Sequence, residues 1–192
     1  MRFVLLAAGT TLVFLGARDL IESELGQQTA ARNFPRAASL TRTTFPRGSP
    51  APPHLRIGET VARLSIPRLN TELYVVEGDD DRELRRGPGH IPGTAPPGAT
   101  GNTVIAGHRD THFRVLKDIR RGDTIRLQTP TKLLRYSVER TFVVAPSDTA
   151  SLQPTKEPEL HLVTCYPFYW VGNAPERFVV EARLVSEKTR LE

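Results

Sequence analysis

ELHLVTCYPF, residues Glu159 to Phe168, joins a strand pattern to the only cysteine of this 192-residue chain. Successive side chains of a strand point to opposite faces, so Leu160 and Leu162 share the face expected to meet the core. Cys165 lies on the other, more polar face together with His161, at the end of the strand and just before a turn. The pattern predicts a thiol that points away from the core, which favours a catalytic role for Cys165 over a role in packing.

Six further strand-like runs surround this one in the sequence. They are residues 59–69, 71–78, 101–108, 123–129, 133–146 and 177–186. Segments rich in Gly, Pro and Asp separate them, and short helices are predicted over Asp80–Arg86 and His112–Ile119. Seven or eight short strands at this spacing predict a mainly β domain, either a closed barrel or a sandwich.

An apolar, uncharged stretch opens the chain, from Phe3 to Ala17. It is shorter than the roughly 20 residues that span a bilayer as a helix, but an extension to Ile21 with Arg18 at the interface would suffice. No small-residue cleavage site follows directly. The stretch therefore predicts a transmembrane anchor over residues 1–21, with a cleaved signal peptide as the alternative, and an extracytoplasmic domain in either case.

The following segment, residues 22–55, is rich in Pro, Ser, Thr and Arg and is predicted to be a tether. The folded domain is expected over residues 56–187. The net charge of +5 comes from scattered basic residues, which indicates a solvated basic surface or attraction to an anionic envelope and argues against nucleic-acid binding.

A single cysteine in an exported protein cannot form an intramolecular disulfide. It is either a small buried hydrophobe or a nucleophile, and a nucleophile needs a base or a cation nearby because the thiolate is the reactive form. His108 ends the run NTVIAGH as Cys165 ends LHLVTC, so two strands that finish together would place them side by side. His161 shares the strand and face of Cys165 but lies about 13 Å back along it.

The remaining histidines are weaker candidates for a catalytic base. His54 falls in the tether. His90 is enclosed by turn residues and is expected to be structural. His112 opens a predicted helix and is expected to be exposed.

Arg177 opens the last strand pattern, after the turn YPFYWVGNAPE. A hairpin-like return would bring its guanidinium near Cys165, where a fixed cation could stabilise an oxyanion or orient a carbonyl. The alternative is an ordinary surface arginine.

Taken together, these motifs resemble the sortases, the membrane-anchored cysteine transpeptidases of bacterial surfaces. The resemblance covers Arg56 to Ser186 and rests on LVTC, on the histidine that ends NTVIAGH and on the arginine of the last strand. LVTCYPF and GPGHIPGTAPPGATGNTVIAGHRD are most similar to class D sortases. His161 departs from the family motif, which typically has threonine at that position.

The resemblance implies a sortase-type β-barrel of about eight strands, in which Cys165 is the nucleophile that forms an acyl-thioester. It implies that His108 is the general acid/base and Arg177 the clamp for the oxyanion or substrate. The implied reaction cleaves an LPxTG- or LPNTA-like sorting motif and transfers the surface protein to an amine of a cell-wall precursor or another protein. Phe168, Tyr169 and Trp170 of the loop from Tyr166 to Glu176 are expected either to help wall the pocket or to pack on the barrel.

No cofactor is expected, and a helix N-terminus explains the acidic run Asp79–Asp81 more simply than a calcium site. Two other functions stay open at this point. One is another exported cysteine hydrolase, such as an L,D-transpeptidase, and the other is a non-catalytic β-domain that binds the cell envelope.

Overall fold

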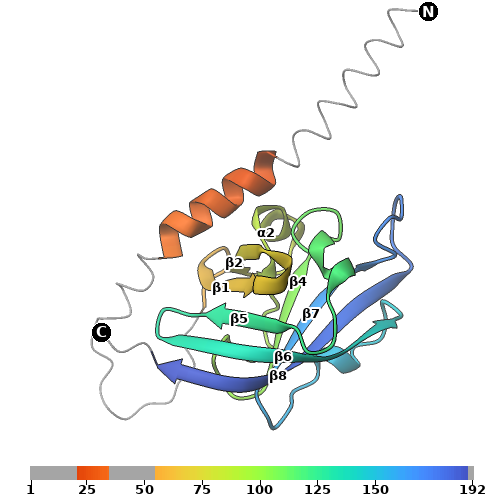
Figure 1. The fold of residues 1–192 in the computed structure, drawn as a ribbon. Helices are drawn as coiled ribbons and strands as arrows, with labels where there is room; N and C mark the ends of the chain where they lie inside the picture. The colour runs from red at the N-terminus through yellow and green to blue at the C-terminus, as the bar shows by residue number, and fades with distance from the viewer. Residues whose placement is uncertain (1–20, 35–54, 190–192) are drawn as a thin grey trace, which may run out of the picture.

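The computed structural model describes residues 21–34 and 55–189, and within them eight strands close into a barrel (Figure 1). Around the barrel the strands follow the order β1-β2-β3-β4-β7-β8-β6-β5. Their bounds are Thr60–Ile66 (β1), Thr71–Glu77 (β2), Gly89–His90 (β3), Asn102–Gly107 (β4), Thr124–Gln128 (β5), Lys132–Val144 (β6), Glu159–Tyr166 (β7) and Glu176–Thr189 (β8). The closed barrel is confirmed, and all seven predicted strands are present.

Within residues 55–189, the elements that the sequence patterns missed are short. β3 has two residues, and the 3-10 turns η1 (Pro67–Leu69) and η3 (Ala150–Leu152) have three each. A run this short shows no periodicity for a pattern to detect. The helix predicted from Asp80 is confirmed as α2 (Asp81–Arg86), and the segment predicted as a helix from His112 contains the 3-10 helix η2 (Arg114–Asp118).

The core fills the barrel with side chains from one face of each strand. Leu160 and Leu162 of β7 are fully buried, as the alternation predicted. They pack in one cluster with buried residues from the other long strands and with Phe113 and Leu116 from the segment around η2. The interior is thus a packed core, and chemistry has to take place at an end or on the outside of the barrel.

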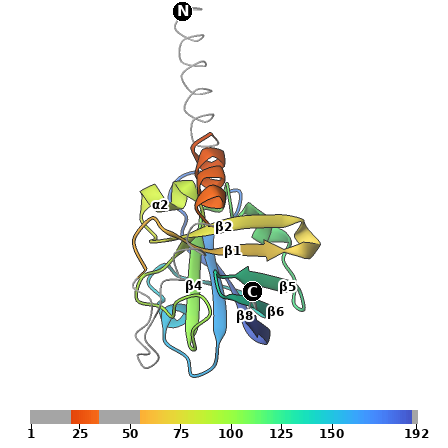
Figure 2. The ribbon, with the colours of Figure 1, turned by 90° about the vertical axis from the view of Figure 1, so that its left-hand side faces the viewer.

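A helix over residues 21–34 lies against the outside of the barrel beside α2 (Figures 1 and 2). This differs from the tether predicted from residue 22 onward. Gly26, Ala30 and Phe34 recur every four residues and are buried against the barrel, a short period that the polar composition of the segment obscured. No helix in the described ranges is long and apolar enough to cross a membrane, and the predicted anchor lies, apart from Ile21, outside those ranges.

Candidate active site

Two parallel strands place the histidine and the cysteine at the same end of the barrel. β4 pairs with β7 from Asn102 opposite Glu159 to Gly107 opposite Thr164, so the next residues along the two strands are His108 and Cys165. The buried hydroxyl of Thr164 donates a hydrogen bond to the Gly107 carbonyl at 2.6 Å, which fixes this last step of the ladder. The prediction that the two strands finish together is confirmed.

The neighbouring antiparallel pair brings in the arginine. β7 and β8 are paired so that Cys165 lies directly opposite Arg177. Side chains of directly opposed residues emerge on the same face of the sheet, with Cβ atoms about 4.5–5.5 Å apart. The hairpin-like return predicted for residues 166–176 is therefore present, and it sets the guanidinium beside the thiol.

A cavity of about 250 Å³ opens where these three strand ends meet. Its lining consists of His108, Arg109, Asp110, Cys165, Gly172, Asn173, Ala174 and Arg177. The structure thus brings all three predicted site residues into one cavity. Cys165 is half-buried, so a substrate carbonyl can reach its thiol while the strand backbone holds the side chain in place.

Arg177 is anchored by the loop that precedes it. Its Nη1 donates to the carbonyl oxygens of Glu176 at 2.9 Å and Ala174 at 3.3 Å. No carboxylate of the described residues forms an ion pair with Arg177, so the charge of the guanidinium is not neutralised locally. Arg177 also lines the cavity, and its planar guanidinium has further N–H donors beyond those bonded to the loop.

Arg109 is a site residue that the strand patterns did not identify. Its Nη2 donates to the carbonyl oxygens of Trp170 at 2.8 Å and Gly172 at 2.9 Å. These two bonds tie the β7–β8 loop to the residue that follows His108. The only signal in the sequence is its position in GHRD, because a side chain-to-loop contact over 60 residues leaves no periodicity.

The aromatic residues of the β7–β8 loop do not line the cavity, so of the two alternatives the aromatic wall is not the one found. Phe168 packs onto the core and edge-on against Tyr166 and Phe178. Tyr169 is exposed and accepts a hydrogen bond from Lys117 Nζ at 3.0 Å, which lowers the pKa of the phenol. The loop meets the cavity through Gly172, Asn173 and Ala174 instead.

His90 is structural, as predicted. It is almost fully buried, its Nδ1 is 2.6 Å from the Glu77 carboxylate, and its Nε2 is 3.0 Å from the Ala95 carbonyl oxygen. Both ring nitrogens are occupied by protein acceptors. His90 therefore has no free ring nitrogen that could act on a substrate.

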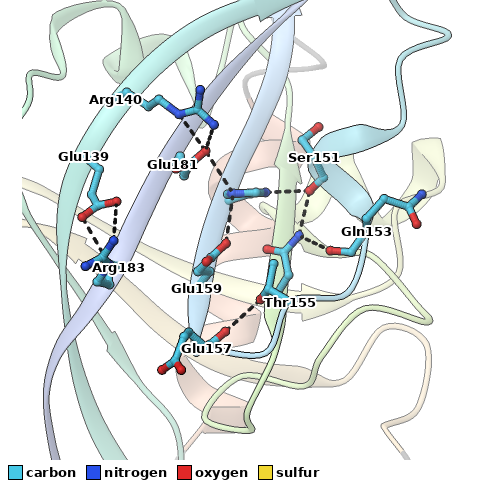
Figure 3. Close-up of polar contacts among 11 residues, drawn as sticks. Glu139, Arg140, Ser151, Gln153, Thr155, Glu157, Glu159, Glu181 and Arg183 are labelled. Carbon is cyan, nitrogen blue, oxygen red and sulfur yellow. Dashed lines mark hydrogen bonds and ion pairs between the residues drawn. The ribbon is translucent and has the colours of Figure 1, made fainter.

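His161 lies on the predicted outward face of β7 but is buried there, because the segment around η3 covers it. Its Nδ1 donates to the Ser151 carbonyl oxygen at 2.6 Å, and its Nε2 lies 3.8–3.9 Å from the carboxylates of Glu159 and Glu181. Figure 3 shows the surrounding polar network, in which Arg140 binds Glu181 and Arg183 binds Glu139. His161 does not line the cavity at Cys165, and its contacts are structural.

His112 is buried, contrary to the exposure predicted for the first residue of a helix. The residue is 7% exposed, and its Nε2 is hydrogen-bonded to the Ser23 hydroxyl of the N-terminal helix at 2.8 Å. Burial, with a smaller contribution from the charge of nearby His108, lowers the pKa of His112 to about 4. The ring is therefore neutral at physiological pH. Patterning within the domain could not show this, because the covering residue comes from the segment predicted to be a tether.

The acidic run before α2 behaves as a helix start. Asp80 is the N-cap residue of α2, and Asp81 lies in its first turn, where a negative charge interacts favourably with the helix dipole. Across residues 21–34 and 55–189, no three His, Cys, Asp or Glu side chains gather closely enough to hold a metal ion.

Comparisons with known proteins agree with the geometry. Residues 64–185 match the family model of the sortase domain. The chain is 35% identical to Sortase D of Bacillus subtilis over 191 residues, which cover 95% of this chain and 96% of that protein. It is 28% identical to Sortase SrtE1 of Streptomyces coelicolor, with 80% of this chain and 48% of that protein covered.

Two solved structures are similar in fold. The Sortase D5 transpeptidase of Clostridium perfringens matches with a TM-score of 0.68 and 25% identity, over 86% of this chain and 99% of that one. The catalytic domain of SrtD from B. anthracis matches with a TM-score of 0.63 and 33% identity, over 76% of this chain and 100% of that one.

Proposed function

Because this chain belongs to the sortase family of cysteine transpeptidases, we propose that Cys165 is its nucleophile, His108 its general acid/base and Arg177 its oxyanion clamp. The observation that carries this assignment is the strand register. Cys165 lies opposite Arg177 across the β7–β8 ladder, and His108 follows the last β4 residue paired with β7. The three side chains line one cavity.

The first half-reaction forms the thioester. The Cys165 sulfur attacks the carbonyl carbon of the scissile peptide bond as a thiolate, and the carbonyl oxygen becomes an oxyanion. The guanidinium of Arg177 donates hydrogen bonds to that oxygen, where charge develops. Protonated His108 then gives its proton to the leaving amine, so the C–N bond breaks and the acyl group stays on sulfur.

The second half-reaction resolves the thioester with an amine. The incoming nitrogen attacks the same carbonyl carbon, neutral His108 accepts its proton, and the sulfur leaves as a thiolate. A new amide bond forms, and His108 returns to the protonated state in which the cycle began. One histidine therefore acts in both half-reactions. Its ring has to stay within reach of the nitrogen that leaves the carbonyl carbon and of the nitrogen that later attacks it.

The substrates we propose follow the class D resemblance. The donor is a surface protein with a C-terminal LPxTG- or LPNTA-like sorting motif, and the acceptor is an amine of a cell-wall precursor or of another protein. Residues 1–21 would hold the enzyme in the cell membrane as a single-pass anchor with the barrel outside. An N-terminal anchor is consistent with the apolar run from Phe3 to Ala17.

The direct test uses the full chain with a sorting-motif peptide and a separate amine. We expect the parent chain to release the C-terminal fragment and to join the remainder to the amine, and Cys165→Ala to do neither while keeping its circular dichroism spectrum. A mass increase of the parent protein that is labile to hydroxylamine would identify the thioester. Turnover by Cys165→Ala would refute the assignment of Cys165, and cleavage without any amine adduct would favour a hydrolase.

A further inference from the structure

The N-terminal helix, residues 21–34, is fitted closely to the barrel. Ala30 and Phe34 are only 2% and 6% exposed, and the Phe34 ring meets Tyr74 edge-on at 5.9 Å between centroids. At Gly26 a Cβ atom would come within 2.5 Å of the Arg86 Cα and 2.6 Å of its carbonyl oxygen. The helix backbone therefore touches the end of α2 directly, at a distance that only glycine permits.

The Gln27 side chain fixes the register of this contact. Its Oε1 accepts a hydrogen bond from the Tyr74 N–H at 2.7 Å, and its Nε2 donates to the carbonyl oxygens of Tyr74 and Arg86 at 3.0 Å each. β3 pairs with β2 only at Val76 and Glu77, so Gln27 takes the place of a neighbouring strand at Tyr74. At Arg86 it satisfies a carbonyl at the end of α2 that has no partner within that helix. Three directional bonds from one amide allow a single position of the helix.

The turn that carries the proposed catalytic histidine lies against the same helix. This segment, residues 108–113, is called here the His108 turn. The Phe113 N–H donates to the His108 carbonyl oxygen at 2.9 Å, and a Cβ atom on Gly107 would meet the Phe113 ring at 2.7 Å. The turn is thus closed on itself and packed onto the end of β4.

The outer side of the His108 turn is held by the helix. Ser23, one helical turn before Gln27, is hydrogen-bonded to His112 at 2.8 Å. Ser23 and His108 also line a common cavity of about 240 Å³. Burial keeps the His112 ring neutral, so no second positive charge arises beside a protonated His108.

We propose that the N-terminal helix positions His108: Gln27 locks the helix onto β2 and α2, and Ser23 holds the His108 turn through His112. The inference rests on the proposed role of His108 and adds a reason why that imidazole stays in place through both half-reactions. Reacting groups displaced by about 1 Å can lose up to about 100-fold in rate. A contact outside the cavity can therefore control turnover without touching the substrate.

Two adjacent glutamines provide a matched test in the full chain. Gln27 makes the three bonds described above, whereas Gln28 is exposed and, among residues 21–34 and 55–189, bonds only to Glu24 of its own helix. Transpeptidation should be measured with a sorting-motif peptide and an amine, at a temperature where circular dichroism shows both variants to be folded. We expect Gln27→Ala to lower kcat about 10-fold with KM within about twofold of the parent chain, and Gln28→Ala to change neither.

Ser23 provides a second pair of variants, which should disturb folding less than Gln27→Ala. Ser23→Ala removes the hydroxyl and should lower kcat severalfold, and Ser23→Thr keeps a hydroxyl and should restore it. A helix that only stabilises the barrel would lower the melting temperature of Gln27→Ala but leave kcat unchanged in folded protein. That result, or equal kcat in Ser23→Ala and Ser23→Thr, would overturn the proposal.

His108→Ala separates this inference from the proposed function. Loss of activity in His108→Ala together with normal kcat in Gln27→Ala would reject only the positioning role of the helix. Full activity in His108→Ala would reject the role of His108 itself, and the inference would fall with it.

Discussion

Acidification should destabilise this protein through His112, and replacing that one residue should remove much of the effect. His112 has a pKa of about 4 in the folded protein because burial disfavours the charged ring, whereas an unfolded chain has a histidine pKa of about 6.5. At a pH between these two pKa values, the unfolded chain binds a proton at His112 and the folded protein does not. The free energy of unfolding therefore decreases as the pH falls below about 6.5, and the decrease is complete below about pH 4.

The size of the effect follows from the pKa difference. One pKa unit corresponds to about 1.4 kcal/mol, so the change from 6.5 to about 4 is worth about 3 kcal/mol when both states are protonated. At about pH 5 only the unfolded state is substantially protonated, and the loss relative to about pH 7.5 is about 2 kcal/mol. This is a large fraction of the 5–15 kcal/mol that is typical of a whole domain.

Urea unfolding at both pH values would measure this loss by circular dichroism for the parent chain and for His112→Gln. Other titrating groups act alike in the two proteins, so their contributions cancel in the comparison. We expect the loss between about pH 7.5 and 5 to be smaller in His112→Gln by about 2 kcal/mol. An equal loss in both proteins, or an NMR titration of His112 with a midpoint near 6.5, would refute the reasoning.

Two further predictions separate the site from its surroundings. Arg177→Lys keeps the charge but not the planar fork, so kcat/KM for a sorting-motif peptide should stay about 10²–10³-fold below the parent chain, the loss typical of a missing oxyanion donor. Recovery to within a few-fold would show that charge alone suffices. His161→Ala should leave kcat/KM within about twofold, because His161 does not line the cavity. It should cost only about 1 kcal/mol of stability through its lost hydrogen bond, since the Ser151 carbonyl keeps the bond from Asn102 Nδ2. An inactive but folded His161→Ala together with an active His108→Ala would reverse the histidine assignment.

Cys165 and His108 could be proposed as site residues from local patterns, whereas the choice of a barrel over a sandwich and the role of Arg177 depend on the resemblance to the sortases. Alternation along β7 places Leu160 in the core and Cys165 on the opposite face, and that rule needs only neighbouring residues. The pairing of Cys165 with Arg177 needs one more assumption, that the chain reverses between the two strands. The register of β7 and β8 confirms it.

The features that sequence reasoning missed all depend on contacts between residues distant in the chain. Arg109 acts on the β7–β8 loop, the η3 segment covers His161, and Ser23 covers His112 from a segment predicted to be a tether. His161 and His112 are side chains that the sequence pattern would expose, and each is covered by a segment whose position no local pattern determines. Arg109 instead donates to loop carbonyl oxygens that no local pattern places beside it.

The strand ladders of the barrel restrain two of the three proposed site residues but not the third. Strand pairing sets Cys165 and Arg177 side by side, with the backbone of both in the β7–β8 ladder. His108 lies one residue beyond the last paired residue of β4, so no strand ladder restrains it. Its position depends on the Phe113 contact at the base of the turn and on the helix that covers His112. If the nucleophile and the clamp are set by the barrel and the acid/base by its support, weakening that support should slow both proton transfers and leave the thiol and the guanidinium where they are.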